Sequence, residues 1–416
     1  MTSDLEERLR RDLKNYSERA RPDSIRPLRE PASRRRSRAV RWLAPVAAGA
    51  AVVGVIIAVS IVSSPAARPP ARTVAEPPGP MPPFYVTAWQ TYAGSHNGQV
   101  IPTFATVHDS ATGATLATVR VPTLTSPGGT PGPTITAAGD DRTFVIMEQS
   151  DSPNANRFYL LHVAANGRSA ALTRLSISVP ADLSVQDVAL SPDGTRLALG
   201  YQRDCSARIS ACRSSGIRVV TMATGTARSW STRANGAPFG VSWAGNDRLA
   251  FQWQYAGRTS PAGQQTGYRL LNLDGAGRDL LAARPIASPG AEPNYYVPQA
   301  LVTADGAVVI TSTVQNIPDG HGRYTVVAKV IELSADTGQL LRVLYTVTVR
   351  HASGGGGGTA GSLDQGCNVL SLSPAGEHVL VACFAFGRVD GHGFRPLPGF
   401  PGPSSSGISG QQAAAW

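Results

Sequence analysis

Short stretches in which apolar and polar residues alternate recur from Phe84 to the end of the chain, and tight-turn sequences separate them in pairs. Alternation with a period of two predicts half-buried β-strands, and a turn rich in Gly, Asp or Asn between two such strands predicts a hairpin. Residues 84–416 are therefore predicted to form an all-β domain.

A strand–turn–strand unit with related sequence occurs five times in this domain. The turns are centred on Asp140, Asp193, Asn246, Asp305 and Ala375. A second hairpin follows each of the first four turns, and two hairpins make a four-stranded sheet. Together with an earlier unit that starts at Phe84, six units predict a six-bladed β-propeller, with seven blades as the alternative.

Ring closure is predicted to use the end of the chain. The unit at Phe84 contains only about three strands, and the chain ends on the apolar run Ala413–Trp416. Because a propeller leaves only short, protected edges when its first and last sheets meet, we expect this run to supply the missing strand.

Residues 42–62 contain no charged side chain, and five arginines lie directly before them. At about 1.5 Å per residue a helix of this length spans a bilayer core of about 30 Å, and the arginines mark the cytoplasmic side. The predicted organisation is a cytoplasmic basic tail (1–41), a transmembrane helix (42–62), a Pro-rich linker (63–83) and an extracytoplasmic propeller (84–416).

The turn Ser191-Pro192-Asp193-Gly194, followed by an apolar strand, resembles the turns of WD-repeat-like and Tol-type periplasmic propellers. The whole chain, with its Arg-rich start, single span and repeat domain, resembles membrane-anchored propeller proteins of actinobacteria. The resemblance implies a propeller fold over about residues 84–416 and a binding role, without naming a site.

Charge does not point to nucleic acid. The net charge is +10, but the tail holds 13 of the 38 basic residues and 7 of the 28 acidic ones, and no nucleic-acid-binding motif is present. In the tail, a capping-box pattern at Ser3–Glu6 with Leu5, Leu9 and Leu13 predicts a short amphipathic helix. That helix either docks a cytoplasmic partner such as a sigma factor or has no role beyond the membrane topology of the chain.

All four cysteines follow the predicted span, in a compartment where disulfides form. Cys367 and Cys383 are each eight residues from Ala375, so a simple hairpin register places them opposite each other. Cys205 and Cys212 bound one loop and form the second predicted pair. Their spacing does not suit a metal site, and none is predicted.

Catalytic signatures are absent from the sequence, so neither an enzyme nor a cofactor is predicted. The first hypothesis is a membrane-tethered module that binds a protein, peptide or glycan, with Tyr295 and Tyr296 in a loop as part of the partner surface. The second is an extracytoplasmic hydrolase or lactonase with a metal in the channel, and a third is a sensor that signals through its tail. Several Asp, Glu, His or Asn side chains converging on the channel would favour the hydrolase, whereas an apolar or Arg-lined channel would favour binding.

Overall fold

The computed structural model describes residues 81–416 except for 90–102, 123–132, 149–155, 181, 204–213, 235, 255–266, 276, 287–299, 319–323, 352–366, 384 and 398–411. The predicted tail, span and most of the linker lie outside the described residues, as do Cys205, Cys212, Tyr295 and Tyr296. In the part that is described, no helix is long and apolar enough to cross a membrane.

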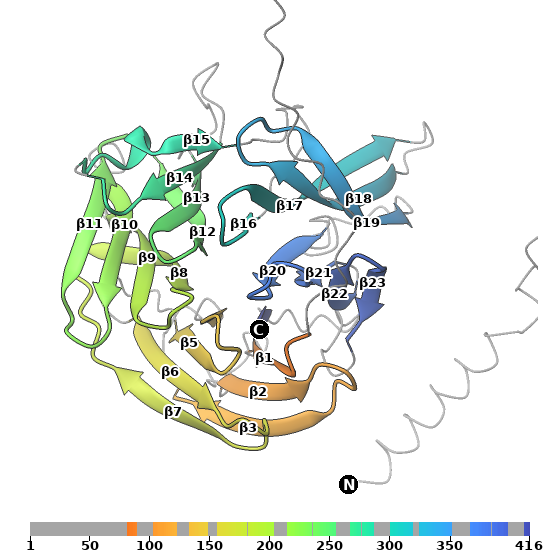
Figure 1. Ribbon diagram of the computed structural model, residues 1–416, viewed down its shortest axis with the longest axis horizontal. Coiled ribbons are helices and arrows are strands. Elements are labelled where there is room, and N and C mark those ends of the chain that lie inside the picture. The colour runs from red at the N-terminus through yellow and green to blue at the C-terminus, as the bar shows by residue number, and fades with distance from the viewer. Residues whose placement is uncertain are drawn as a thin grey trace, which may run out of the picture. The chain divides into compact units, whose positions relative to one another are not determined.

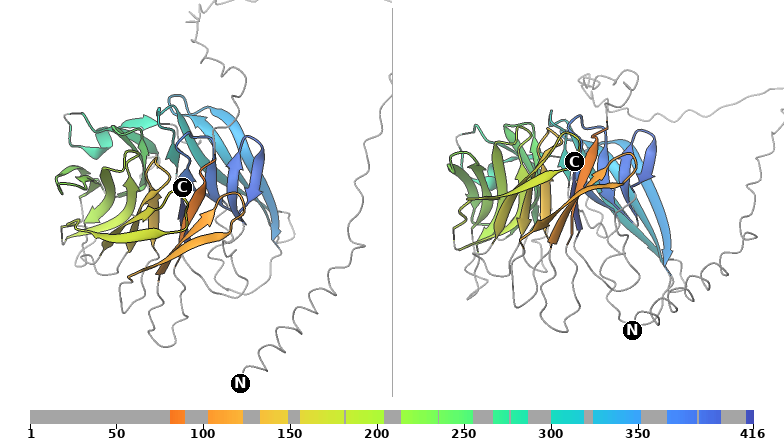
Figure 2. Two further views of the ribbon diagram at one scale, coloured as in Figure 1. Left: turned by 60° about the horizontal axis from the view of Figure 1, so that its bottom comes forward. Right: turned by 90° about the horizontal axis from the view of Figure 1, so that it is seen from below.

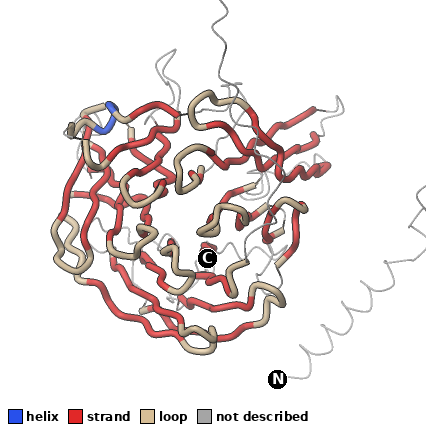
Figure 3. The backbone as a smooth tube through the Cα atoms, in the orientation of Figure 1, coloured by secondary structure: helices blue, strands red, loops and turns tan. Residues whose placement is uncertain are grey.

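Six four-stranded antiparallel sheets form a ring (Figures 1 and 3). We number these blades in chain order. Blade 1 contains β24 (Gln412–Ala415), β1 (Phe84–Trp89), β2 (Thr103–Asp109) and β3 (Thr115–Val121). Blade 2 contains β4 (Thr134–Ala137), β5 (Thr143–Glu148), β6 (Arg157–Val163) and β7 (Ala170–Leu175). Blade 3 contains β8 (Leu183–Leu190), β9 (Arg196–Arg203), β10 (Ser215–Thr221) and β11 (Ala227–Thr232).

Blade 4 contains β12 (Ala237–Ala244), β13 (Arg248–Gln254), β14 (Tyr268–Asn272) and β15 (Arg284–Ile286), with the 3-10 turn η3 (Leu280–Ala282) before β15. Blade 5 contains β16 (Leu301–Val302), β17 (Val308–Pro318), β18 (Tyr324–Ser334) and β19 (Leu340–His351). Blade 6 contains β20 (Asn368–Leu372), β21 (Val379–Ala382), β22 (Phe386–Asp390) and β23 (Gly393–Pro396). The predicted six-bladed, all-β fold is confirmed.

Each blade begins with an inner strand at the ring centre and ends with an outer strand at its perimeter (Figure 1). The inner strands β24, β4, β8, β12, β16 and β20 contact one another around the centre. The turns between inner strands and their neighbours lie at one end of the ring, which we call the tight-turn end.

The hydrophobic core is divided among the six interfaces between neighbouring blades. Six clusters of buried side chains each draw on two adjacent blades, so both faces of a blade are covered. The largest joins blades 3 and 4 and includes Trp230, Trp243 and Trp253. Since every blade depends on two neighbours, the ring must close for the first and last blades to be stable.

Ring closure follows the prediction from the sequence. β24 pairs with β1 in antiparallel register, with Ala414 opposite Thr87 and Ala415 opposite Val86. Trp416 is 1% exposed and packs in the cluster that joins blades 6 and 1. The end of the chain thus supplies the inner strand that the first unit lacks.

The predicted turn residues have a structural role at the tight-turn end. The Asp140 carboxylate accepts backbone N–H bonds from Arg142 and Thr143, at 2.9 and 2.8 Å. Asp193 accepts one from Thr195, and Asp305 one from Ala307, both at 3.0 Å. Aspartate at these positions fixes the turn by accepting bonds from backbone groups two or three residues ahead.

Cys367 and Cys383 are joined by a disulfide across β20 and β21, with their Cα atoms 4.0 Å apart. Their neighbours Asn368 and Ala382 are paired, so the simple register holds here, and a bulge shifts it beyond Val369. The predicted pairing is therefore present in the structure.

Replacing both bridged cysteines with serine is expected to destabilise the protein by about 3 kcal/mol, because the bridge closes a short loop in the unfolded chain. Thermal unfolding of the double variant with and without reductant checks this. Since the variant keeps Cys205 and Cys212, reductant should lower its melting temperature by less than it lowers that of the native chain. A native chain that is indifferent to reductant would contradict the prediction.

Candidate functional site

A cavity of about 620 Å³ occupies the centre of the ring and is lined by residues of all six inner strands. Its lining is divided almost evenly between polar groups and apolar ones, with Ile135, Val188, Leu301 and Leu370 among the apolar contributors. At the tight-turn end the lining passes into turn residues such as Ala304. The size of the cavity is that of a ligand pocket.

Polar groups in this lining link neighbouring inner strands to one another. Inner strands have no sheet partner on the cavity side, so some of their backbone groups bond to side chains of the next blade. The contacts are Leu190 N to Thr136 Oγ1 (3.1 Å), Val241 N to Asp187 Oδ2 (2.6 Å), Trp243 Nε1 to the Ala189 carbonyl (2.9 Å), Ser242 Oγ to the Ala300 carbonyl (3.4 Å) and Trp416 N to Ser371 Oγ (3.2 Å).

Asp187 is the acidic residue that lies deepest in the cavity wall. Its carboxylate accepts backbone N–H bonds from Val188 at 2.8 Å and Val241 at 2.6 Å, and from Gly240. The residue keeps part of its surface accessible through the cavity, yet its carboxylate is surrounded by protein atoms. This burial raises the pKa of the Asp187 carboxyl to about 6, against the three N–H bonds that favour the charged form.

The stability of the native chain is expected to fall as pH rises from about 4 to about 6, because the Asp187 carboxyl releases its proton at a higher pH in the folded state than in the unfolded state. Its folded pKa of about 6 lies above the unfolded value of 3.8, so between these values only the folded state holds the proton. Asparagine at this position does not titrate. The melting temperature of Asp187→Asn, relative to that of the native chain, should therefore rise between pH 4 and pH 7. A difference that stays constant over this range would show that Asp187 is already charged at pH 4.

Other polar residues of the lining are used within the turns. The Asp193 carboxylate accepts a hydrogen bond from Ser191 Oγ at 2.5 Å, and the Asn246 side chain accepts one from the Asp193 N–H at 3.2 Å. Asp187 and Asp193 stand at different depths, one in β8 and one in the turn after it. Within the described residues, no group of three or more His, Cys, Asp or Glu side chains could hold a metal ion.

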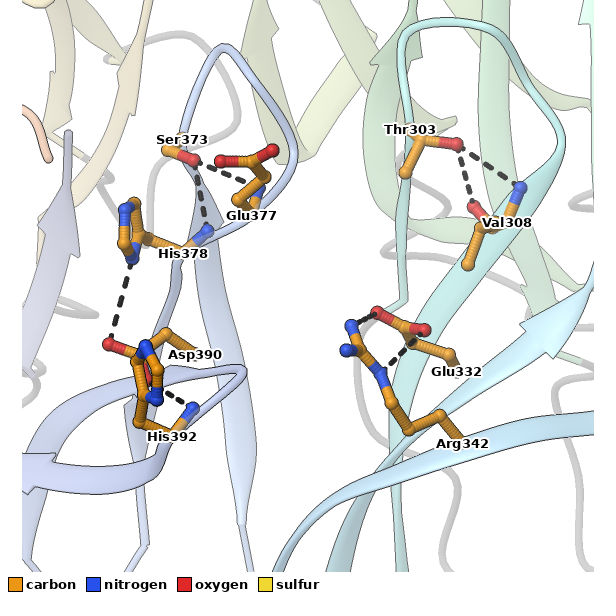
Figure 4. Close-up of polar contacts among 9 residues, drawn as sticks. All are labelled: Thr303, Val308, Glu332, Arg342, Ser373, Glu377, His378, Asp390 and His392. Atoms are coloured by element: carbon orange, nitrogen blue, oxygen red, sulfur yellow. Dashed lines mark hydrogen bonds and ion pairs between the residues drawn. The ribbon is translucent and has the colours of Figure 1, made fainter. Parts of the chain in front are cut away.

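A second polar cluster is buried beside the ring-closing strand and is separate from the cavity. The Asp390 carboxylate lies 3.8 Å from His378 Nδ1 (Figure 4). It also lies 3.6 Å from Arg388 Nε. The same carboxylate accepts the His392 N–H at 2.8 Å. The His378 ring meets Trp416 edge-on, with ring centroids 6.0 Å apart. This cluster orients the interface of blades 6 and 1.

The sequence did not single out Asp187 or Ser371. Asp187 breaks the apolar pattern of β8 (LSVQDVAL), which marks a polar position in a buried strand. That signal could have flagged the residue, but only the ring shows that it faces the cavity. The predicted partner residues Tyr295 and Tyr296 lie outside the described residues and stay a prediction.

The sheet order and central cavity define a six-bladed β-propeller. Among solved structures, the chain is similar to TolB from Acinetobacter baumannii, at 13% identity and a TM-score of 0.45 over 81% of this chain and 67% of that one. A putative TolB from Agrobacterium tumefaciens is 11% identical, with a TM-score of 0.36 over 64% of this chain and 89% of that one.

An acylaminoacyl peptidase from Pyrococcus horikoshii is 9% identical, with a TM-score of 0.43 over 76% of this chain. The chain spans about half of that peptidase, or 51% of its length. No family model matches the chain, and no curated protein matches it by sequence. These likenesses concern the fold alone, and the blade count rests on the sheets described above.

Proposed function

We propose that this protein is a membrane-tethered, extracytoplasmic β-propeller that binds a protein, peptide or glycan in its central cavity. The cavity itself is the observation that supports this function. It is lined by six strands, has a volume of about 620 Å³, and presents apolar side chains together with hydroxyl, amide and carboxyl groups. Ligand pockets commonly have this size.

A cavity-blocking variant tests this function. Ala304 is exposed in the turn before β17 and lines the cavity, so Ala304→Trp should obstruct the opening without disturbing the core. Ala375 is exposed in the corresponding turn of blade 6 but is not part of the lining, which makes Ala375→Trp the matched control.

The probes are a panel of synthetic peptides and cell-envelope oligosaccharides, applied to the purified full chain in detergent. We expect at least one class to bind, with affinity reduced about tenfold or more by Ala304→Trp and unchanged by Ala375→Trp. Equal binding to both variants would place the ligand outside the cavity, and a panel without any binder would contradict the proposal.

The hydrolase or lactonase alternative is favoured by one observation, the Asp187 carboxyl. A carboxyl with a pKa of about 6 facing a cavity is suited to proton transfer. Its oxygens already accept backbone N–H bonds, and this arrangement fits a residue that holds β8 and β12 together better than a catalytic acid or base. Cleavage of an ester or lactone by the full chain, lost in Asp187→Asn while folding is kept, would favour the alternative.

The tether rests on the uncharged residues 42–62 and the arginines before them. Thr224 lies in an exposed turn of blade 3, so Thr224→Cys should react with a membrane-impermeant maleimide in intact cells. Ser24→Cys, in the tail, should react only after the cells are permeabilised. The unsubstituted chain controls for the native cysteines, and the reverse labelling pattern would contradict the orientation.

A further inference from the structure

Blade 5 carries an exposed apolar strip at the perimeter of the ring. Among the described residues, all the large apolar side chains that are exposed belong to this blade. Leu340, Leu341 and Val343 lie together on β19, are exposed by 56%, 51% and 43%, and form the strip. Ile317 on β17, exposed by 44%, lies apart from them in the row that ends at Arg350. Soluble domains seldom expose such groups together unless the surface binds something.

Strand length explains the exposure. β17, β18 and β19 have 11, 11 and 12 residues, while the outer strands of the other blades have three to seven. On the face toward blade 4, Ile331 and Leu333 of β18 are buried against that blade. Their partners Val343 and Leu340 on β19 are exposed, since β15, the outer strand of blade 4, has only three residues. The strands continue past their neighbour (Figure 2), so the rest of this face meets solvent.

The strand registers place a polar surface next to the apolar strip. Thr313, Lys329 and Thr346 are paired across the three strands, and the next row on the same face holds Gln315 and Thr348 with Val327 between them. Lys329, Thr346, Gln315 and Thr348 are exposed. Leu340 and Val343 pair with Leu333 and Ile331 of β18. These two partners are four and two residues from Lys329, so they point to the same face as Lys329.

The charge of this surface is basic. Glu332 is the one acidic residue of β17–β19, and Arg342 neutralises it through two hydrogen bonds, at 2.7 and 3.2 Å (Figure 4). Lys329 is exposed and has no ion pair among the described residues. A complementary partner therefore presents apolar side chains to the strip and a carboxylate to Lys329.

β19 is also the outermost strand of its sheet, so its outer backbone groups have no sheet partner among the described strands. A long edge strand with exposed apolar side chains accepts a further strand. A second copy fits poorly, because the strip occupies one end of β19. Antiparallel self-pairing over the whole strand would place Leu340 opposite His351 and Leu341 opposite Arg350.

We propose that β19 and the adjoining blade face bind an extended segment of a partner protein, which adds a strand to blade 5 and carries apolar residues followed by a carboxylate. This surface, formed by Leu340, Leu341, Val343, Lys329 and Thr346, is separate from the central cavity. The proposal for this surface therefore holds whether or not the cavity binds a ligand.

The test uses a short fluorescent peptide that alternates valine with threonine and carries glutamates in its second half, and a matched peptide with lysines in their place. Both are titrated against the full chain in detergent and followed by anisotropy. The surface variants are Leu341→Lys combined with Val343→Lys, and Lys329→Glu. All three positions are exposed, so folding should be kept. Thr173→Lys, exposed on the outer strand β7, is the control.

We expect the glutamate peptide to bind the native chain and Thr173→Lys equally, and about tenfold more weakly to the double lysine variant. Lys329→Glu should reverse the preference, so that the lysine peptide binds better than the glutamate peptide. The proposal is overturned if neither peptide binds the native chain or if the surface variants leave binding unchanged. Self-association of the native chain that is lost in the double lysine variant would also overturn it, in favour of a second copy.

Discussion

A chain that lacks residues 412–416 is expected to lose the closed ring and to melt far below the intact protein. The deletion removes β24, its pairing with β1 and the buried side chains of Ala414 and Trp416. Loss of a fully buried tryptophan alone costs about 3–5 kcal/mol. The deletion also exposes the edge of β1 that faces the ring centre, which should promote aggregation. Thermal unfolding and size-exclusion chromatography of the full chain measure both effects.

Trp416→Phe is the control for this deletion, since it keeps the strand and most of the apolar contact. It should melt between the native chain and the deletion variant. Unchanged melting and solubility of the deletion variant would mean that β24 does not close the ring.

Gly216→Ala is expected to disrupt blade 3. A Cβ atom at this position would lie 2.2 Å from the Trp230 carbonyl oxygen and 2.6 Å from the Tyr201 hydroxyl. The carbonyl belongs to the neighbouring strand β11, so relief requires the sheet itself to move. We expect a loss of at least about 3 kcal/mol, at the upper end for overpacking.

The matched control is Gly277→Ala, in an exposed turn of blade 4 where an added Cβ meets nothing within 4 Å. Its melting temperature should stay close to that of the native chain. Equal melting temperatures for the two glycine variants would contradict the close packing of β10 against β11 at Gly216.

Much of the fold could be predicted because its signals are local. Strands with alternating apolar residues occur in all six units, and turns centred on residues such as Asp193 and Asp305 occur in five of them, which predicted the blade count. The Cys367–Cys383 pair followed from the symmetry of one hairpin. Trp416 could be assigned to blade 1 because that unit was one strand short.

The candidate site was harder to predict from the sequence, because it depends on how strands that are far apart in the chain meet in the fold. Asp187 and Ser371 are 184 positions apart in the sequence, yet both line one cavity. A sequence pattern shows that Asp187 interrupts an apolar strand, but not which blade its carboxylate faces. The exposed face of blade 5 depends likewise on the shorter strands of blade 4, which leave Lys329 uncovered.

The most direct test of the closed six-bladed ring is a cross-link between its first and last strands. Thr87 and Ala414 are register partners on β1 and β24, so cysteines at both positions should form a disulfide in the oxidised full chain. Peptide mapping should recover residue 87 joined to residue 414, with Cys367 still joined to Cys383. Recovery of the native bridge without the new one would contradict closure by the C-terminal strand.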